Sequence, residues 1–306
     1  MKRDFLSIKD LQLEEIEHIF SLTDELKAKV KDHSRSLSGK SLGLIFLKPS
    51  LRTRVSFEVG MNQLGGYALS LAAEDIKFGT REAAKDFGKV LSRYLDALVV
   101  RTFSHSEVEE LADSSDIPVI NGLTDLLHPC QALSDLYTIK EKKGNLDDIK
   151  LAFIGDGNNV AHSLLYGCAK LGVNLKIATP SKHKPDEEIF NHAKELAKSS
   201  GVEIILSDKP SSAAANADVI YTDVWASMGQ EREYKKKVKD FKGFQVNQEL
   251  LSLAKPDCLV MHCLPAHRGE EITDEVLDGA HSIVFDQAEN RMHLQKAILL
   301  MLLGGY

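Results

Sequence analysis

The sequence KPSLRTR, which begins at Lys48, gathers cations and hydroxyl groups directly after an apolar run. Ser50 can cap the helix that follows. The first turn of such a helix offers free N–H groups and the positive end of the helix dipole. Arg52 adds a planar fork that suits phosphate oxygens, and Thr53 adds a hydroxyl. The segment therefore predicts an anion site, and the alternative is an ordinary capped helix with surface arginines.

The sequence HPCQ places two further polar side chains at the start of another expected helix. His128 precedes Pro129, and proline favours the first helical position. Gln131 follows one turn later, so both side chains could face one ligand. An imidazole could donate to a carbonyl oxygen, and a glutamine could hold an NH₂ group. The alternative is a histidine whose hydrogen bonds are satisfied locally.

The sequence GDGNNV, which ends at Val160, resembles the opening of a dinucleotide-binding unit. Val160 stands where the third glycine of that motif belongs. The acid expected after the next strand is also missing, because the nearest one is Asp186. These departures argue against dinucleotide binding. The loop is better interpreted as an edge that presents Asn158 or Asn159.

Two further polar segments follow buried runs in the second half of the chain. Asp223 could pair with an ammonium group, and Met228 in the SMG sequence could cover a ligand adaptably. His262, Cys263 and His267 suggest zinc, but they lack a second ligand pair at zinc-finger spacing. No cysteine-protease signature surrounds Cys263. We expect a thiol that lines a polar site beside Asp223.

The elements that must position these residues alternate between short apolar runs and amphipathic stretches, which predicts parallel sheets covered on both faces. The expected fold class is α/β, with two doubly wound parallel-sheet domains joined by interdomain helices. Polar clusters follow the strands, where open parallel sheets bind ligands. The expected strands are 42–47, 97–101, 117–121, 151–154, 175–179, 202–206, 218–222, 258–262 and 282–285. The expected helices include 51–64, 129–142, 160–171 and 186–199.

Three shorter features complete this scheme. Arg101 ends one expected strand. Arg291 is expected at the start of the last helix, where it could close over an anion. The charged run 235–240 predicts a solvated helix face.

Composition narrows the function classes. The chain has 306 residues, which favours two domains, and a net charge of −7, which argues against a nucleic-acid partner. The four cysteines form no CxxC pair, as expected in the cytoplasm. The run AILLMLL is shorter than the roughly 20 apolar residues of a membrane span, so we expect no membrane partner.

Together these motifs resemble the transcarbamoylase family. SxRTR and HPxQ are typical of the whole family, and the combination of D-x-x-x-SMG with HCLP is similar to its ornithine-specific members. The resemblance implies transfer of a carbamoyl group from carbamoyl phosphate to L-ornithine without metal or organic cofactor. It also implies a homotrimer or a multiple of trimers. The implied domains are 1–136 for carbamoyl phosphate, 137–286 for ornithine, and a C-terminal helix, 287–306, that packs back on the first domain.

The resemblance also implies roles for individual residues. The implied catalytic residues are Arg101, His128 and Cys263. The implied carbamoyl-phosphate ligands are Ser50, Leu51, Arg52, Thr53, Lys77, Arg101, His128, Gln131, Cys263, Leu264 and Arg291. The implied ornithine ligands are Asn159, Asp223, Ser227 and Met228.

Two positions depart from the family pattern, and the acceptor remains open to alternatives. Leu51 replaces a threonine, which leaves a backbone N–H but no hydroxyl. Lys77 stands where many members have a glutamine that reaches the neighbouring subunit. The alternatives are a transcarbamoylase for putrescine, N-acylornithine or aspartate, and a non-catalytic phosphate-binding module.

Overall fold

The computed structural model describes residues 2–29, 33–71, 83–226 and 234–304. The chain divides into two compact units. The first unit comprises Met1–Leu133 and Asn290–Tyr306, and the second comprises Ser134–Glu289. The divisions fall inside helices α5 (Pro129–Lys143) and α12 (Val284–Leu303), and each unit is described by itself.

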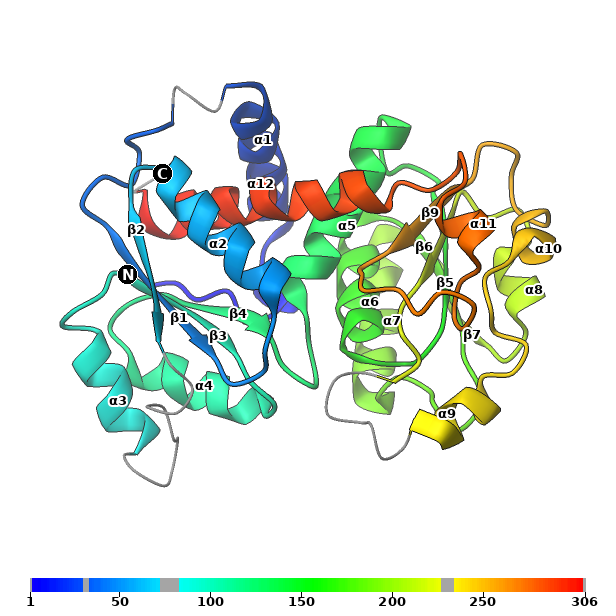
Figure 1. The fold of residues 1–306 in the computed structure, drawn as a ribbon, viewed down its shortest axis with the longest axis horizontal. Coiled ribbons are helices and arrows are strands. Elements are labelled where there is room, and N and C mark those ends of the chain that lie inside the picture. The colour runs from blue at the N-terminus through cyan, green and yellow to red at the C-terminus, as the bar shows by residue number, and fades with distance from the viewer. Residues whose placement is uncertain (1, 30–32, 72–82, 227–233, 305–306) are drawn as a thin grey trace. The chain divides into compact units, whose positions relative to one another are not determined.

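The first unit contains a four-stranded parallel sheet in the order β2-β1-β3-β4 (Figure 1). Strands β1 and β3 are buried because apolar residues fill both faces, as in a covered parallel sheet. The strands are β1 (Ser41–Phe46), β2 (Tyr67–Leu71), β3 (Ala97–Arg101) and β4 (Val119–Leu123). The helical segments before α5 are η1 (Ile8–Asp10), α1 (Leu13–Ala28), α2 (Leu51–Gln63), α3 (Ala84–Leu91) and α4 (His105–Ser114).

The second unit contains a five-stranded parallel sheet in the order β7-β6-β5-β8-β9. Helices α6 and α7 pack against each other, and α8 contacts the strands (Figure 1). The strands are β5 (Lys150–Ile154), β6 (Asn174–Ala178), β7 (Ile204–Ser207), β8 (Val219–Thr222) and β9 (Leu259–His262). The helices are α6 (Asn159–Leu171), α7 (Glu187–Ser200), α8 (Pro210–Ala214), α9 (Tyr234–Asp240), α10 (Gln248–Leu251) and α11 (Asp274–Leu277).

The strand orders explain where ligands can bind. In the first sheet the chain moves outward from β1 in one direction and from β3 in the other, so the order reverses between these two strands. In the second sheet the same reversal falls between β5 and β8. Crevices form outside the carboxyl ends of parallel strands at such reversals. The loops after β1, β3, β5 and β8 are therefore the segments where ligand-binding side chains are expected.

Two parallel sheets with flanking helices confirm the predicted fold class. The prediction of a strand at 282–285 is wrong, because α12 already begins at Val284 and Ser282 forms only an isolated bridge with Val260. A short apolar run fits a helix as well as a strand, and the helix continues through twenty residues. Arg291 consequently lies two turns inside α12 rather than at its start.

A search of the described residues finds no helix with both the length and the apolar character needed to cross a membrane.

Candidate functional site

The carboxyl ends of the strands in the first unit carry a cationic cluster, which we define as Ser50, Thr53, Arg101, His128 and Arg291. Ser50 is the N-cap of α2, and its Oγ accepts a hydrogen bond from the backbone N–H of Thr53 at 3.3 Å. The Nη2 of Arg291 donates to Thr53 Oγ1 at 2.9 Å. The buried hydroxyl of Thr53 therefore joins the start of α2 to a guanidinium from α12.

Arg101 enters the same cluster from the end of β3. Its side chain is 8% exposed, and its Nε donates to the backbone oxygen of Lys48 at 3.2 Å. The backbone N–H groups of Leu47 and Lys48 in turn bond to the carbonyl of Arg101. These contacts hold the guanidinium beside the loop that follows β1.

His128 lies among these cations. Its side chain is 5% exposed, and burial lowers the pKa of its imidazole well below the ordinary value. The charges of Arg291, Arg101 and Lys48 lower this pKa further, in that order. The imidazole is therefore neutral at neutral pH and can donate one N–H while it carries no charge.

The remaining residues predicted for this region differ in exposure. Gln131 is buried in the first turn of α5, at 1% exposure. Arg52 and Leu51 are exposed in the first turn of α2, and Leu51 is 71% exposed. Lys77 falls outside the residues that the structure describes. No sequence motif assigned a specific role to Lys48, which is 4% exposed, forms an ion pair with Asp125 and lies over the ring of Phe103.

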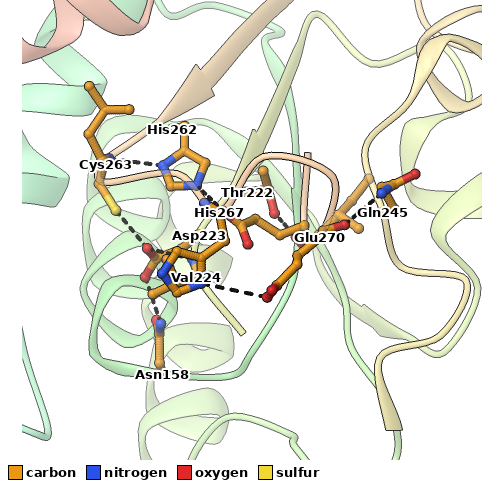
Figure 2. A network of polar contacts seen from close by, with 12 residues as sticks. Asn158, Thr222, Asp223, Val224, Gln245, His262, Cys263, His267 and Glu270 are labelled. Carbon is orange, nitrogen blue, oxygen red and sulfur yellow. Dashed lines mark hydrogen bonds and ion pairs between the residues drawn. The ribbon is translucent and has the colours of Figure 1, made fainter. Parts of the chain in front are cut away.

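The second unit carries a thiol–carboxylate cluster, which we define as Asn158, Asp223 and Cys263 (Figure 2). Asn158 Nδ2 donates to Asp223 Oδ2 at 2.8 Å, and Cys263 Sγ donates to Asp223 Oδ1 at 2.8 Å. Asn158 also caps α6 by accepting from the N–H groups of Val160 and Ala161. Three strand ends, those of β5, β8 and β9, thus meet at one carboxylate.

The backbone after β9 is held by His262. The imidazole Nδ1 accepts from the N–H of Leu264 at 2.9 Å, so its Nε2 carries the hydrogen and donates to Glu271 Oε1 at 3.0 Å. His262 and Glu271 are both fully buried. Leu264 has a positive φ of 55°. The sequence pattern did not identify Glu271, since nothing in its local spacing marks it as a partner of His262.

These residues include donor atoms close enough to consider a metal. Donor atoms of Asp223, His262 and Cys263 lie within 4.8 Å of one another, and a second such set comprises His267, Glu270 and Glu271. Both ring nitrogens of His262 are already engaged within the protein, by Leu264 and Glu271. We therefore assign Asp223 and Cys263 to contacts with an organic substrate rather than with a metal ion.

The other predicted residues of the second unit divide into two groups. Asn159 is the first residue of α6 and is 8% exposed, next to Asn158, which bonds Asp223. Ser227 and Met228 lie outside the described residues.

All four cysteines are free thiols, and burial raises the pKa of Cys130 and of Cys258 to about 12. Cys263 is partly exposed and lies at a strand end.

The fold and the two clusters define a two-domain α/β protein with a cationic cluster in one unit and a thiol–carboxylate cluster in the other. Residues 3–141 match the model for the carbamoyl-phosphate-binding domain of aspartate/ornithine carbamoyltransferases, and residues 147–302 match the model for their aspartate/ornithine-binding domain. The chain belongs to the aspartate/ornithine carbamoyltransferase family.

Individual relatives cover nearly the whole chain. The chain is 54% identical to an ornithine carbamoyltransferase of Anoxybacillus flavithermus, over 98% of this chain and 96% of that protein. It is similar to the structure of ornithine carbamoyltransferase from Pyrococcus furiosus, with a TM-score of 0.96, 51% identity and coverage of 99% and 98%. The anabolic enzyme from Campylobacter jejuni gives a TM-score of 0.94, 39% identity and 99% coverage of both chains.

Proposed function

We propose that this protein transfers the carbamoyl group of carbamoyl phosphate to the δ-amine of L-ornithine, which gives L-citrulline and phosphate. The observation that carries the proposal is the pair of strand-end clusters, one cationic and one built on Asp223, in a chain of this family. Relatives named ornithine carbamoyltransferase, including an anabolic enzyme, support this acceptor and a role in arginine biosynthesis.

In this proposal the first unit binds carbamoyl phosphate. Ser50, Arg52 and Thr53, with the backbone N–H of Leu51, hold the phosphate at the positive end of α2. Arg291 is placed to contribute because its guanidinium already bonds Thr53. Lys77 would add a further cation. These groups stabilise the charge that phosphate gains as it leaves.

The carbonyl group must also be polarised for attack. Arg101 and the neutral imidazole of His128 would donate hydrogen bonds to the oxygen that becomes negative in the tetrahedral intermediate. Gln131, one turn into α5, would hold the carbamoyl NH₂ group. The first unit thus supplies the donors for both negative charges of the reaction.

The second unit binds the amine acceptor. Asp223 would pair with the α-ammonium of ornithine, because its carboxylate is held by Asn158 and Cys263 and is the acidic group of the cluster. Asn159, Ser227 and Met228 would complete the contacts with the amino-acid end. Cys263 and the backbone of Leu264 would contact the substrates without forming a covalent bond. The free δ-amine then attacks the carbonyl carbon, the C–O bond to phosphate breaks, and the amine loses its proton.

The decisive experiment measures carbamoylation of several amines by the purified protein. With carbamoyl phosphate, ornithine should give citrulline at a rate well above that with putrescine, N-acetylornithine or aspartate. A reaction without the protein corrects for spontaneous carbamoylation. Preference for another amine would replace ornithine as the acceptor, and release of no phosphate with any amine would leave a binding module.

We further propose a homotrimer or a multiple of trimers. The support in this chain is an exposed apolar stripe on α2, where Leu51, Val55 and Val59 recur one turn apart at 71%, 43% and 39% exposure. Strand β2, which ends the order of the described sheet, adds exposed Tyr67 and Leu69. Exposed apolar groups of this kind indicate a protein interface.

The oligomeric state can be tested by light scattering after gel filtration. The wild type should have a mass of three chains or a multiple of three, and Val55→Lys should lower it. Val90→Lys changes an exposed valine on α3 and is the matched control. A monomeric wild type would contradict the proposal.

We also propose a cytoplasmic location, which the four free thiols support.

A further inference from the structure

Helix α9 is bonded to two turns that follow strands of the second unit. Lys237 Nζ donates to Asp156 Oδ2 at 2.5 Å, in the turn after β5. One helical turn later, Asp240 Oδ2 lies 3.0 Å from His183 Nε2, in the segment between β6 and α7. Lys237 and Asp156 are only 5% and 7% exposed. The prediction that 235–240 is a solvated face is therefore wrong at Lys237, because this side chain turns inward to reach a buried carboxylate.

The turn that contains Asp156 packs tightly against the backbone of residues 183–185. The N–H of Gly157 donates to the carbonyl of His183 at 2.9 Å. A Cβ at Gly157 would lie 2.2 Å from the backbone nitrogen of Pro185, so no side chain fits there. Asn158 comes directly after Gly157 and orients Asp223 (Figure 2). Any shift of Asp156 would therefore move Asn158, which bonds the carboxylate of Asp223.

The end of α9 is also tied to the loop that carries Asp223. Phe241, the residue after α9, stacks on Trp225 with ring centroids 5.6 Å apart, and its ring is tilted by 37° to that of His183 with centroids 4.9 Å apart. Trp225 lies two residues after Asp223. The helix therefore contacts, through adjacent side chains, both of the loops that supply Asn158 and Asp223.

Stability alone does not explain why the ion pair between Lys237 and Asp156 is buried. Removing two charges from water costs much of what their attraction returns, and apolar replacements are often as stable. Burial raises the pKa of Asp156, Lys237 opposes this shift, and the charge of Asp223 adds to it. Asp156 is therefore electrostatically coupled to the carboxylate of Asp223, and its charge is offset chiefly by Lys237 and to a lesser degree by His183, whose Nδ1 lies 3.8 Å away.

We propose that Lys237 and Asp156 are positioning residues of the acceptor site. Their ion pair fixes the turn that carries Asn158, and through Asn158 it fixes the carboxylate of Asp223. The inference rests on the proposed function, since it assigns Asp223 to the amine substrate. It predicts an effect on acceptor binding that is separate from the effect on stability.

The test compares Lys237→Met, Asp156→Asn and the double variant in the full-length protein. Steady-state kinetics give KM for ornithine and for carbamoyl phosphate at a temperature well below the Tm of every variant. Each single change should raise KM for ornithine by about tenfold or more and leave KM for carbamoyl phosphate within about twofold. The double variant should be no worse than the poorer single variant, because both singles break the same contact.

Lys236→Met is the matched control, because Lys236 is an exposed lysine on the same helix. Asp156→Asn keeps the volume of the side chain and an acceptor for Lys237, so it tests the pair if Lys237→Met does not fold. Lower Tm with both KM values unchanged, or an equal rise of both, would overturn the inference. A wild type that makes no citrulline would instead refute the proposed function, so the two failures are distinguishable.

Discussion

The two strand-end clusters stand on the same kind of parallel sheet but are built from opposite charges. In the first unit, the end of β3 brings Arg101 and helix α12 brings Arg291 beside a neutral imidazole. In the second unit, the ends of β5, β8 and β9 bring an amide and a thiol onto one carboxylate. The topology predicts where a ligand binds in each unit, and the side chains in the loops predict which charge it carries.

Two buried lysines, one in each unit, have partners of different charge. Lys237 in the second unit is paired with the carboxylate of Asp156. Lys296 in the first unit is 1% exposed, and its Nζ donates to the amide oxygen of Gln63 at 2.9 Å. Burial lowers the pKa of Lys296. A buried lysine charge next to a neutral amide lowers the stability of the fold, whereas one next to a carboxylate holds two segments together.

The largest effect is expected in the cationic cluster. Arg101→Ala should lower kcat by about 10²–10³, because one donor to the developing oxyanion is lost. The measurement is citrulline formation at saturating substrates. Arg54→Ala is the control, since Arg54 is an exposed arginine of α2 that forms an ion pair with Glu58 at 3.8 Å. Near-normal turnover of the Arg101 variant would refute the role of this residue.

A second change should separate the two clusters kinetically. Asp223→Asn keeps the shape of the side chain but removes the charge that pairs with the α-ammonium. KM for ornithine should rise about 10- to 100-fold, as expected for a lost charge-assisted bond, while KM for carbamoyl phosphate stays unchanged. Asp208→Asn, an exposed aspartate in the loop after β7, is the control. An equal rise in both constants would mean that the clusters do not bind separate substrates.

The pH dependence of activity should follow the titration of the δ-amine of ornithine rather than that of His128. Ornithine attacks as the free amine, whose ordinary pKa is about 10.4, so kcat/KM for ornithine should rise about tenfold per pH unit on the alkaline side of neutrality. The pKa of His128 is held low, so its protonation should not reduce activity between about pH 6.5 and 7.5. Lys48→Met removes one of the cations that lower this pKa, so the acid limb should move to higher pH. An acid limb in the wild type that follows the titration of His128 near its ordinary pKa would contradict this account.

The smallest effect concerns stability and contrasts the two lysines. Lys296 has a lowered pKa when folded, so the unfolded chain binds more protons and the free energy of unfolding rises with pH as this lysine deprotonates. Lys296→Met should abolish that rise and increase Tm near pH 7 by about 1–3 °C. Lys237→Met should lower Tm. Thermal unfolding followed by circular dichroism at several pH values measures both, and shifts of the same sign would contradict the comparison.

Much of the fold could be predicted from the sequence because short apolar runs and amphipathic stretches alternate at spacings typical of strands and helices. The runs at 97–101 and 151–154 lie within β3 and β5. The run at 282–285 was misassigned, since four apolar or small residues carry no usable period. Strand β2 was not predicted, and its side chains are exposed or half-exposed, unlike the buried runs of β3 and β4.

The residue types and their order along the chain are enough to say which chemistry the protein can offer. The types and order of Ser50, Arg101, His128, Asp223 and Cys263 reflect side-chain chemistry and local helix and strand ends, which depend on neighbours along the chain. Three pairings depend instead on how the chain packs: Arg291 bonds Thr53, Glu271 holds His262, and Lys237 turns inward to Asp156. The pairs Thr53–Arg291 and Asp156–Lys237 join segments that are distant in sequence, and Glu271 reaches back to His262 across the loop after β9. Their partners are selected by packing and by the cost of burying an unpaired charge, and neither leaves a periodic signal in the chain.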